Sequence, residues 1–158
     1  MEDKRLEATL RLLDIMDTLR EKCPWDRKQT FESLRGNTIE ETYELADAIT
    51  DGNLEAIKEE AGDLLLHVVF YAKLGQEAGV FDYAGLVDSL CDKLVYRHPH
   101  VYGDVEADTP DQVKENWEAL KLRKKKPDTK GPVDLDDYDY GDDEDEEYEN
   151  EDLSLIHI

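Results

Sequence analysis

Four carboxylate side chains stand in two pairs of equal spacing, Glu41 with Glu44 and Glu60 with Asp63. Residues three apart are neighbours on a helix surface, with β-carbons about 5–6 Å apart, so each pair would point in one direction. A short turn between two such helices would make them antiparallel neighbours and let all four carboxylates converge. Clustered hard oxygen ligands suit Mg²⁺. The spacing therefore predicts a magnesium site, at which Mn²⁺ could substitute.

Asp63 is the most informative of these residues because it directly precedes the apolar run 64–66, where a helix should be largely buried. A buried carboxylate is costly unless it is protonated, paired with a base or bound to a cation. The alternative is a solvated acidic helix face, with Glu41 merely closing a capping box begun by Thr38. That alternative leaves a carboxylate on the buried side unexplained, so the metal site is favoured.

The segments that must position these carboxylates have the pattern of helices. Apolar residues recur every three or four positions, which is the period of one helix face. The expected helices cover about 6–19, 38–50, 54–78, 86–94 and a short stretch from Pro110. Segments 21–37 and 98–108 are expected to interrupt them, and no segment alternates long enough to build a sheet. We predict an all-α fold, a helical bundle of four to five helices.

Two helix starts carry capping signals. Asp51-Gly52-Asn53 has the composition of a turn, with Asn53 as the expected N-cap of the following helix. Thr109-Pro110-Asp111-Gln112 has the form of a capping box with proline at the first helical position. The first signal matters more, because that turn would join the two carboxylate-bearing helices.

The formal charge of −22 is unevenly distributed over the 158 residues. Residues 1–126 hold 27 acidic and 18 basic side chains, net −9, whereas residues 127–158 hold 14 and one, net −13. Such a balance argues against a nucleic acid polymer as partner, since affinity for phosphate chains comes mainly from Lys and Arg. No stretch is apolar enough for a membrane span or a secretory signal. We expect a cytoplasmic protein.

The chain is expected to divide into three parts. Residues 1–126 would form the helical catalytic domain, and the low-complexity segment 127–152 would be a disordered acidic tail. Residues 153–158 turn abruptly apolar and match the translation of a transposase adapter used in DNA library preparation. We expect these six residues to be a sequencing artefact, which would leave open whether a second domain was lost.

Ordered blocks of sequence resemble the MazG family of nucleoside triphosphate pyrophosphohydrolases. Glu40-Glu41-Thr-Tyr-Glu44 followed by Glu60-Ala-Gly-Asp63 is similar to its EExxE…ExxD signature. Flanking blocks agree in order over about residues 6–124: CPWD at 23–26, Gln29-Thr30, GDLLL at 62–66, Lys93 to Arg97, HPHVYGD at 98–104, and Trp117 to Lys121. The CPWD and HPHV blocks resemble the N-terminal type of this domain, which in two-domain members is not always the efficient catalyst.

The resemblance implies a helical domain that usually forms a homodimer, binds Mg²⁺ and hydrolyses nucleoside triphosphates to the monophosphate and pyrophosphate. It implies that Glu41, Glu44, Glu60 and Asp63 are metal ligands. Glu40 would hold a metal-bound water or a second ion, and either Glu40 or Glu41 would be the catalytic base.

Three further residues acquire substrate-binding roles through the resemblance. Lys93 and Arg97 would contact phosphates, and their spacing of four places both on one helix face. Trp117 would stack on the base without reading its identity. Without the resemblance, Lys93 and Arg97 would be interpreted as a solvated basic edge of a helix and Trp117 as a core residue.

Two rival functions come from other classes. The chain could be a non-catalytic helical interaction module, with an acidic tail that binds basic partners and a metal site that only stabilises folding. The second rival is a carboxylate-bridged di-iron bundle. Such bundles typically use Glu-x-x-His pairs, and because the sequence contains none, this rival is disfavoured.

Overall fold

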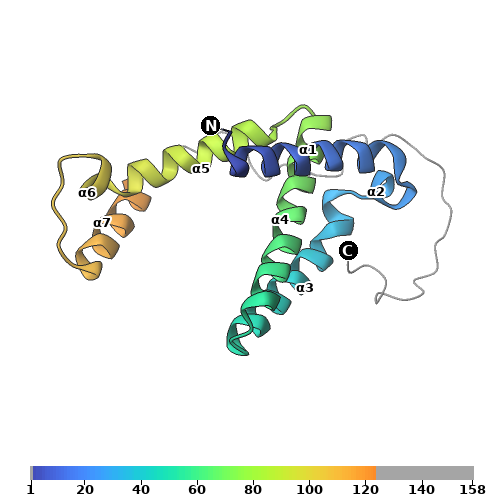
Figure 1. Cartoon of the computed structure of the whole chain (residues 1–158). Coiled ribbons are helices and arrows are strands. Elements are labelled where there is room, and N and C mark those ends of the chain that lie inside the picture. Colours follow the sequence, from blue (N-terminus) through green and yellow to red (C-terminus); the bar gives the residue numbers. More distant parts are fainter. Residues whose placement is uncertain (1, 124–158) are drawn as a thin grey trace. The chain divides into compact units, whose positions relative to one another are not determined.

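The computed structural model of the chain describes residues 2–123, which contain helices and no strand (Figure 1). The segments expected to be a disordered tail, 127–152, and an adapter remnant, 153–158, lie outside the described residues. The predicted all-α class is confirmed, with more helices than expected. They are α1 (Lys4–Lys22), α2 (Pro24–Lys28), α3 (Phe31–Thr50), α4 (Leu54–Glu77), α5 (Tyr83–Arg97), α6 (Pro99–Tyr102) and α7 (Pro110–Arg123).

The described residues form two compact units, one ending at Val80 and the other beginning at Phe81. The first unit contains α1 to α4 and the second contains α5 to α7. Within residues 2–123, no helix has the length and apolar character needed to cross a bilayer.

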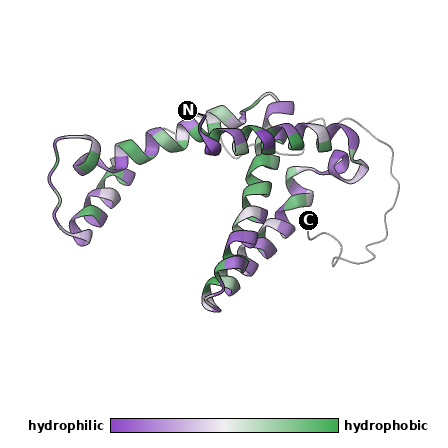
Figure 2. Cartoon of the chain, viewed as in Figure 1, coloured by the Kyte–Doolittle hydropathy of each residue, from purple (hydrophilic) through white to green (hydrophobic). Residues whose placement is uncertain are grey.

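The core of the first unit lies where α1 and α3 pack against α4. Figure 2 shows hydrophobic colouring concentrated in the C-terminal half of α4, with more hydrophilic colouring toward the α3–α4 turn. Burying these side chains, at about 25 cal/mol per Å² of apolar surface removed from water, drives the helices together. The buried apolar residues are Met16, Leu34, Ala48, Val69, Phe70, Ala72 and Leu74.

A tight turn joins α3 and α4, which lie side by side (Figure 1). Gly52 has a φ of 65°, a left-handed conformation that costs glycine little and other residues more. The Asn53 side chain accepts a hydrogen bond from the amide of Ala56 at 3.2 Å, which confirms Asn53 as the N-cap of α4. The two carboxylate-bearing helices are thus an antiparallel hairpin, as expected.

Helix α3 begins at Phe31, not near Thr38, so the expected interruption over 21–37 is partly wrong. Thr30 and Ser33 form a capping box at its start, and Gly36 continues the helix without a break. Packing against α4 outweighs the roughly 1 kcal/mol that an interior glycine costs. Thr38 lies inside α3 and donates its hydroxyl to the carbonyl of Leu34 at 3.0 Å, so it cannot cap the helix for Glu41.

Arg20 ties three helices of the first unit together. Its Nη1 donates to the carbonyls of Asp26, Arg27 and Gln29 at 2.6, 2.8 and 3.0 Å, and its Nη2 pairs with Glu77 on α4 at 3.0 Å. The last carbonyls of a helix lack the usual intrahelical donors, and the guanidinium supplies hydrogen bonds to the carbonyls at this end of α2. Helix α2, which the sequence patterns did not reveal, is held in this way.

The second unit has little interior. Helix α5 agrees with the prediction and is capped by Asp82, whose carboxylate accepts from the amide of Gly85 at 2.8 Å. The expected loop at 98–108 contains the short helix α6, which the sequence did not predict and which begins at Pro99. Helix α7 begins at Pro110 as predicted. None of the side chains described in this unit is fully buried.

Candidate metal centre

The α3–α4 hairpin aligns three successive pairs of polar residues. Thr38 faces His67, Glu41 faces Asp63, and Glu44 hydrogen-bonds with Glu60. Each step is three residues forward on α3 and three or four backward on α4, which is the spacing of facing positions on antiparallel helices. The two carboxylate pairs of the sequence therefore meet across one helix interface.

Three of the predicted ligands come together. One carboxylate oxygen from each of Glu41, Glu60 and Asp63 lies within 4.8 Å of the others. Glu41 is only 8% exposed, whereas Glu60 and Asp63 are half-buried. Glu44 is not part of this triangle, but it shares hydrogen bonds with Glu41 and Glu60 at its edge. The geometry brings all four predicted side chains into one acidic cluster.

The electrostatics of this cluster disfavour its charged form. Burial, followed by repulsion from Glu44 and Asp63, raises the pKa of Glu41 to about 7. Burial and a hydrogen bond with Glu44 also raise the pKa of Glu60, whose Oε2 is buried without a hydrogen-bond partner among the described residues. Like charges this close cannot all ionise unless a cation neutralises them. An all-oxygen donor set with an orphaned buried oxygen fits a hard divalent ion such as Mg²⁺.

Glu40 does not join the triangle. It is exposed on α3 next to Glu41, and neighbouring positions on a helix are turned by about 100° from each other. The structure therefore keeps Glu40 beside the cluster and not within it.

The predicted substrate-binding residues all lie in the second unit. Lys93 and Arg97 are one turn apart on α5, with Lys93 exposed and Arg97 half-buried. The Arg97 guanidinium lies 5.6 Å from the ring centre of Trp117, and the Lys121 ammonium lies 4.8 Å from it. Trp117 is half-buried, so it is neither a core residue nor a fully open stacking surface. Such cation–π contacts hold the indole in place.

Sequence reasoning missed a second polar group in the hairpin. The hydroxyl of Thr38 contacts His67 Nδ1 at 2.7 Å and also bonds with the Tyr71 hydroxyl. The Tyr71 ring stacks on Phe31, with ring centres 5.9 Å apart. The available signal was His67 itself, a polar residue in an otherwise apolar block of α4.

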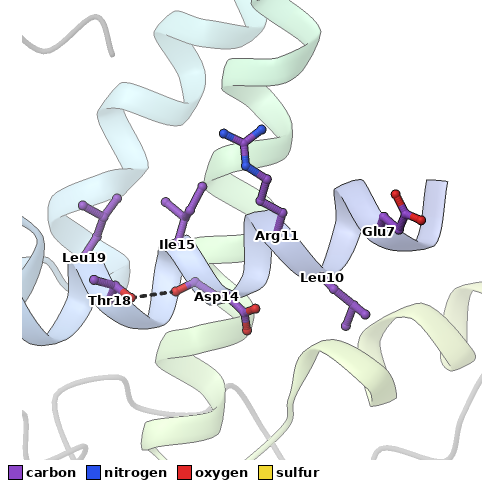
Figure 3. Close-up of a pocket in the computed structure, with 7 residues that line it drawn as sticks. All are labelled: Glu7, Leu10, Arg11, Asp14, Ile15, Thr18 and Leu19. Atoms are coloured by element: carbon purple, nitrogen blue, oxygen red, sulfur yellow. Dashed lines mark hydrogen bonds between the residues drawn. The ribbon is translucent and has the colours of Figure 1, made fainter. Parts of the chain in front are cut away.

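A surface hollow on α1 is a poor candidate for the site. All the residues that line it come from this one helix (Figure 3), and the Thr18 hydroxyl donates to the Asp14 carbonyl at 3.0 Å. They are Glu7, Leu10, Arg11, Asp14, Ile15, Thr18 and Leu19. This hollow shows no convergence of polar groups comparable with the carboxylate triangle.

Comparison with known proteins agrees with this geometry. Residues 29–102 match the model of the MazG nucleotide pyrophosphohydrolase domain, a segment that includes all four carboxylates. The chain is 44% identical over 118 residues to the nucleoside triphosphate pyrophosphohydrolase of Escherichia coli strain K12, covering 73% of this chain and 45% of that protein. It is 47% identical over 116 residues to the nucleoside triphosphate pyrophosphohydrolase/pyrophosphatase MazG of Thermotoga maritima, covering 72% and 44%.

A solved structure supports the same assignment. The crystal structure of a mazG-related protein from Thermotoga maritima superposes with a TM-score of 0.61 at 27% identity, covering 71% of this chain and 97% of that one. The chain spans about half the length of the curated relatives named above. It belongs to the MazG family.

Proposed function

We propose that this chain hydrolyses nucleoside triphosphates to the nucleoside monophosphate and pyrophosphate, in a reaction that depends on Mg²⁺, with Mn²⁺ as a substitute. The observation that carries the proposal is the carboxylate triangle of Glu41, Glu60 and Asp63 inside the MazG-matching segment. The names of the relatives support the reaction class, because both are nucleoside triphosphate pyrophosphohydrolases.

Glu41, Glu44, Glu60 and Asp63 are the proposed metal ligands. A bound divalent ion would supply Lewis-acid neutralisation of the triphosphate charge and activate a water. The proposed base is Glu40 or Glu41. Glu41 lies within the carboxylate triangle, whereas Glu40 is exposed beside it and free to orient a water.

Lys93, Arg97 and Trp117 are the proposed contacts to the nucleotide. Lys93 and Arg97 would form charge-assisted hydrogen bonds with phosphate oxygens and stabilise the departing pyrophosphate. Trp117 would stack on the base, an interaction that reads no base identity. The proposed setting is a homodimer in the cytoplasm, with single nucleotides as substrates and no nucleic acid polymer as partner.

Pyrophosphate release tests the proposal directly. The full chain and its Glu60→Gln variant would be compared on a panel of ordinary and damaged nucleoside triphosphates with Mg²⁺. Glu59→Gln is the matched control, because it removes the same charge from an exposed neighbouring position of α4. Turnover by the wild type and the control, lost in Glu60→Gln, is the expected result. A folded protein that is inactive on the whole panel would favour the non-catalytic interaction module.

A further inference from the structure

We infer that Thr38, His67 and Tyr71 form a positioning network, which fixes the register of α3 against α4 and so aligns the carboxylates for a divalent cation. The inference rests on the proposed function of the carboxylate cluster. It concerns residues that neither bind the ion nor touch the nucleotide in that proposal, and whose effect would pass through the ligands.

Proton positions in the network follow from counting donors and acceptors. The Thr38 hydroxyl has one proton, which it donates to the Leu34 carbonyl at 3.0 Å. Its oxygen can then accept from both His67 Nδ1–H and the Tyr71 hydroxyl. Any other arrangement leaves one of these three close contacts without a proton, and buried polar groups are rarely left so. The structure therefore assigns the Nδ1–H tautomer to His67.

The network lies one helical turn from the carboxylates on both helices. Thr38 precedes Glu41 by three residues on α3, and His67 follows Asp63 by four on α4. At 1.5 Å per residue, these steps are about 4.5 and 6 Å along two antiparallel axes, in the same direction. The pair Thr38–His67 is therefore the position directly adjacent to the pair Glu41–Asp63 in the hairpin.

Apolar packing alone would specify this register weakly. The buried apolar side chains of the two helices, among them Leu34, Phe70 and Leu74, make contacts that are non-directional. Hydrogen bonds at 2.7–3.0 Å require one alignment of donors and acceptors. A shift of α4 along α3 would break the network and separate Glu41 from Asp63 in the same movement.

The test compares Mg²⁺ binding with stability in the full chain. Thr38→Val keeps the shape of the side chain and removes the hydroxyl, and Thr38→Ser restores the hydroxyl. Val69→Ala is the control, because it destabilises the same core without touching the network. Calorimetry would measure the Mg²⁺ dissociation constant and thermal unfolding would measure stability. We expect Thr38→Val to weaken Mg²⁺ binding by roughly 10-fold, the lower end for residues behind metal ligands. Thr38→Ser should bind like the wild type.

Two outcomes would overturn the inference: equal Mg²⁺ affinity in Thr38→Val and wild type, or equal losses in Thr38→Val and Val69→Ala at matched stability. Failure of the proposed function is distinguishable, because the wild type itself would then bind Mg²⁺ no better than Glu60→Gln. Nitrogen NMR of the His67 ring gives a readout independent of the metal. A proton on Nδ1 supports the network, and a proton on Nε2 alone contradicts it.

Discussion

The two units of the chain differ in how much interior they have. The first unit buries residues from α1, α3 and α4, and its acidic triangle stands on this packed base. In the second unit, by contrast, Leu90, Leu94 and Val95 on α5 are 47%, 42% and 48% exposed. Carboxylates of like charge repel one another and need a rigid scaffold to stay together, whereas long cationic side chains can reach a polyphosphate from a less tightly packed one. The proposed metal ligands therefore belong to the first unit and the proposed nucleotide contacts to the second.

The largest expected effect comes from Asp63→Asn. Loss of one charge from the triangle should lower turnover by about 100- to 1,000-fold, as removal of a single electrostatic stabiliser does in other enzymes. It should also abolish the rise in melting temperature that Mg²⁺ produces. Asp47→Asn is the control, because it removes the same charge from an exposed position of α3. Equal losses in both variants would argue against a localised site.

Removing a leucine side chain should cost more unfolding free energy in the first unit than in the second. Leu34→Ala removes a side chain that is 2% exposed and should cost about 3 kcal/mol of unfolding free energy. Leu90→Ala, at 47% exposure, should cost less than about 1 kcal/mol. Denaturant unfolding measures both. A larger cost for Leu90→Ala would reveal that α5 is buried against a partner in solution.

Lys93→Met should raise KM by about 10-fold, equivalent to about 1.4 kcal/mol, by removing one phosphate contact. It should leave the Mg²⁺-induced thermal shift unchanged, because the proposed metal ligands lie in the other unit. Lys114→Met, another exposed lysine of the second unit, should change neither quantity. If Lys93→Met lost its response to Mg²⁺, the division of roles between the units would be refuted.

The smallest effect concerns pH. With its pKa raised to about 7, Glu41 in the folded, metal-free protein holds a proton that the unfolded chain releases near the ordinary glutamate pKa of 4.5. The resulting stabilisation is complete below that lower value and is lost as the pH rises through the folded pKa. Mg²⁺ competes with this proton, so its thermal shift should grow by a few degrees between about pH 5.5 and about pH 8. A constant shift would mean that Glu41 is not a ligand.

The sequence predicted the carboxylate cluster because three-residue spacing on two helices around one turn leaves little freedom in how they meet. It failed where tertiary packing decides. Gly36 and Asn37 looked like a break, yet both lie inside α3, the helix that packs along α4. The Thr38–His67–Tyr71 network depends on the register between helices, which no local pattern contains.

The division into two units was also beyond sequence reasoning. The apolar period of α5 resembles that of α3 and α4, and periodicity does not reveal whether an apolar face finds a partner within the same chain. For the same reason Trp117 could be read as core or as a stacking surface. The structure places cationic side chains against its ring.

The turn at Asp51–Asn53 has a consequence for the order of folding. Every proposed metal ligand lies within the α3–α4 hairpin. Bringing the ligands together therefore closes only a short loop of chain and requires no contact between residues distant in sequence. Local contacts carry a small loop-closure entropy and form early in folding. The carboxylates should therefore meet before the rest of the protein is assembled, and a cation available at that stage could nucleate the hairpin on a chain still emerging from the ribosome.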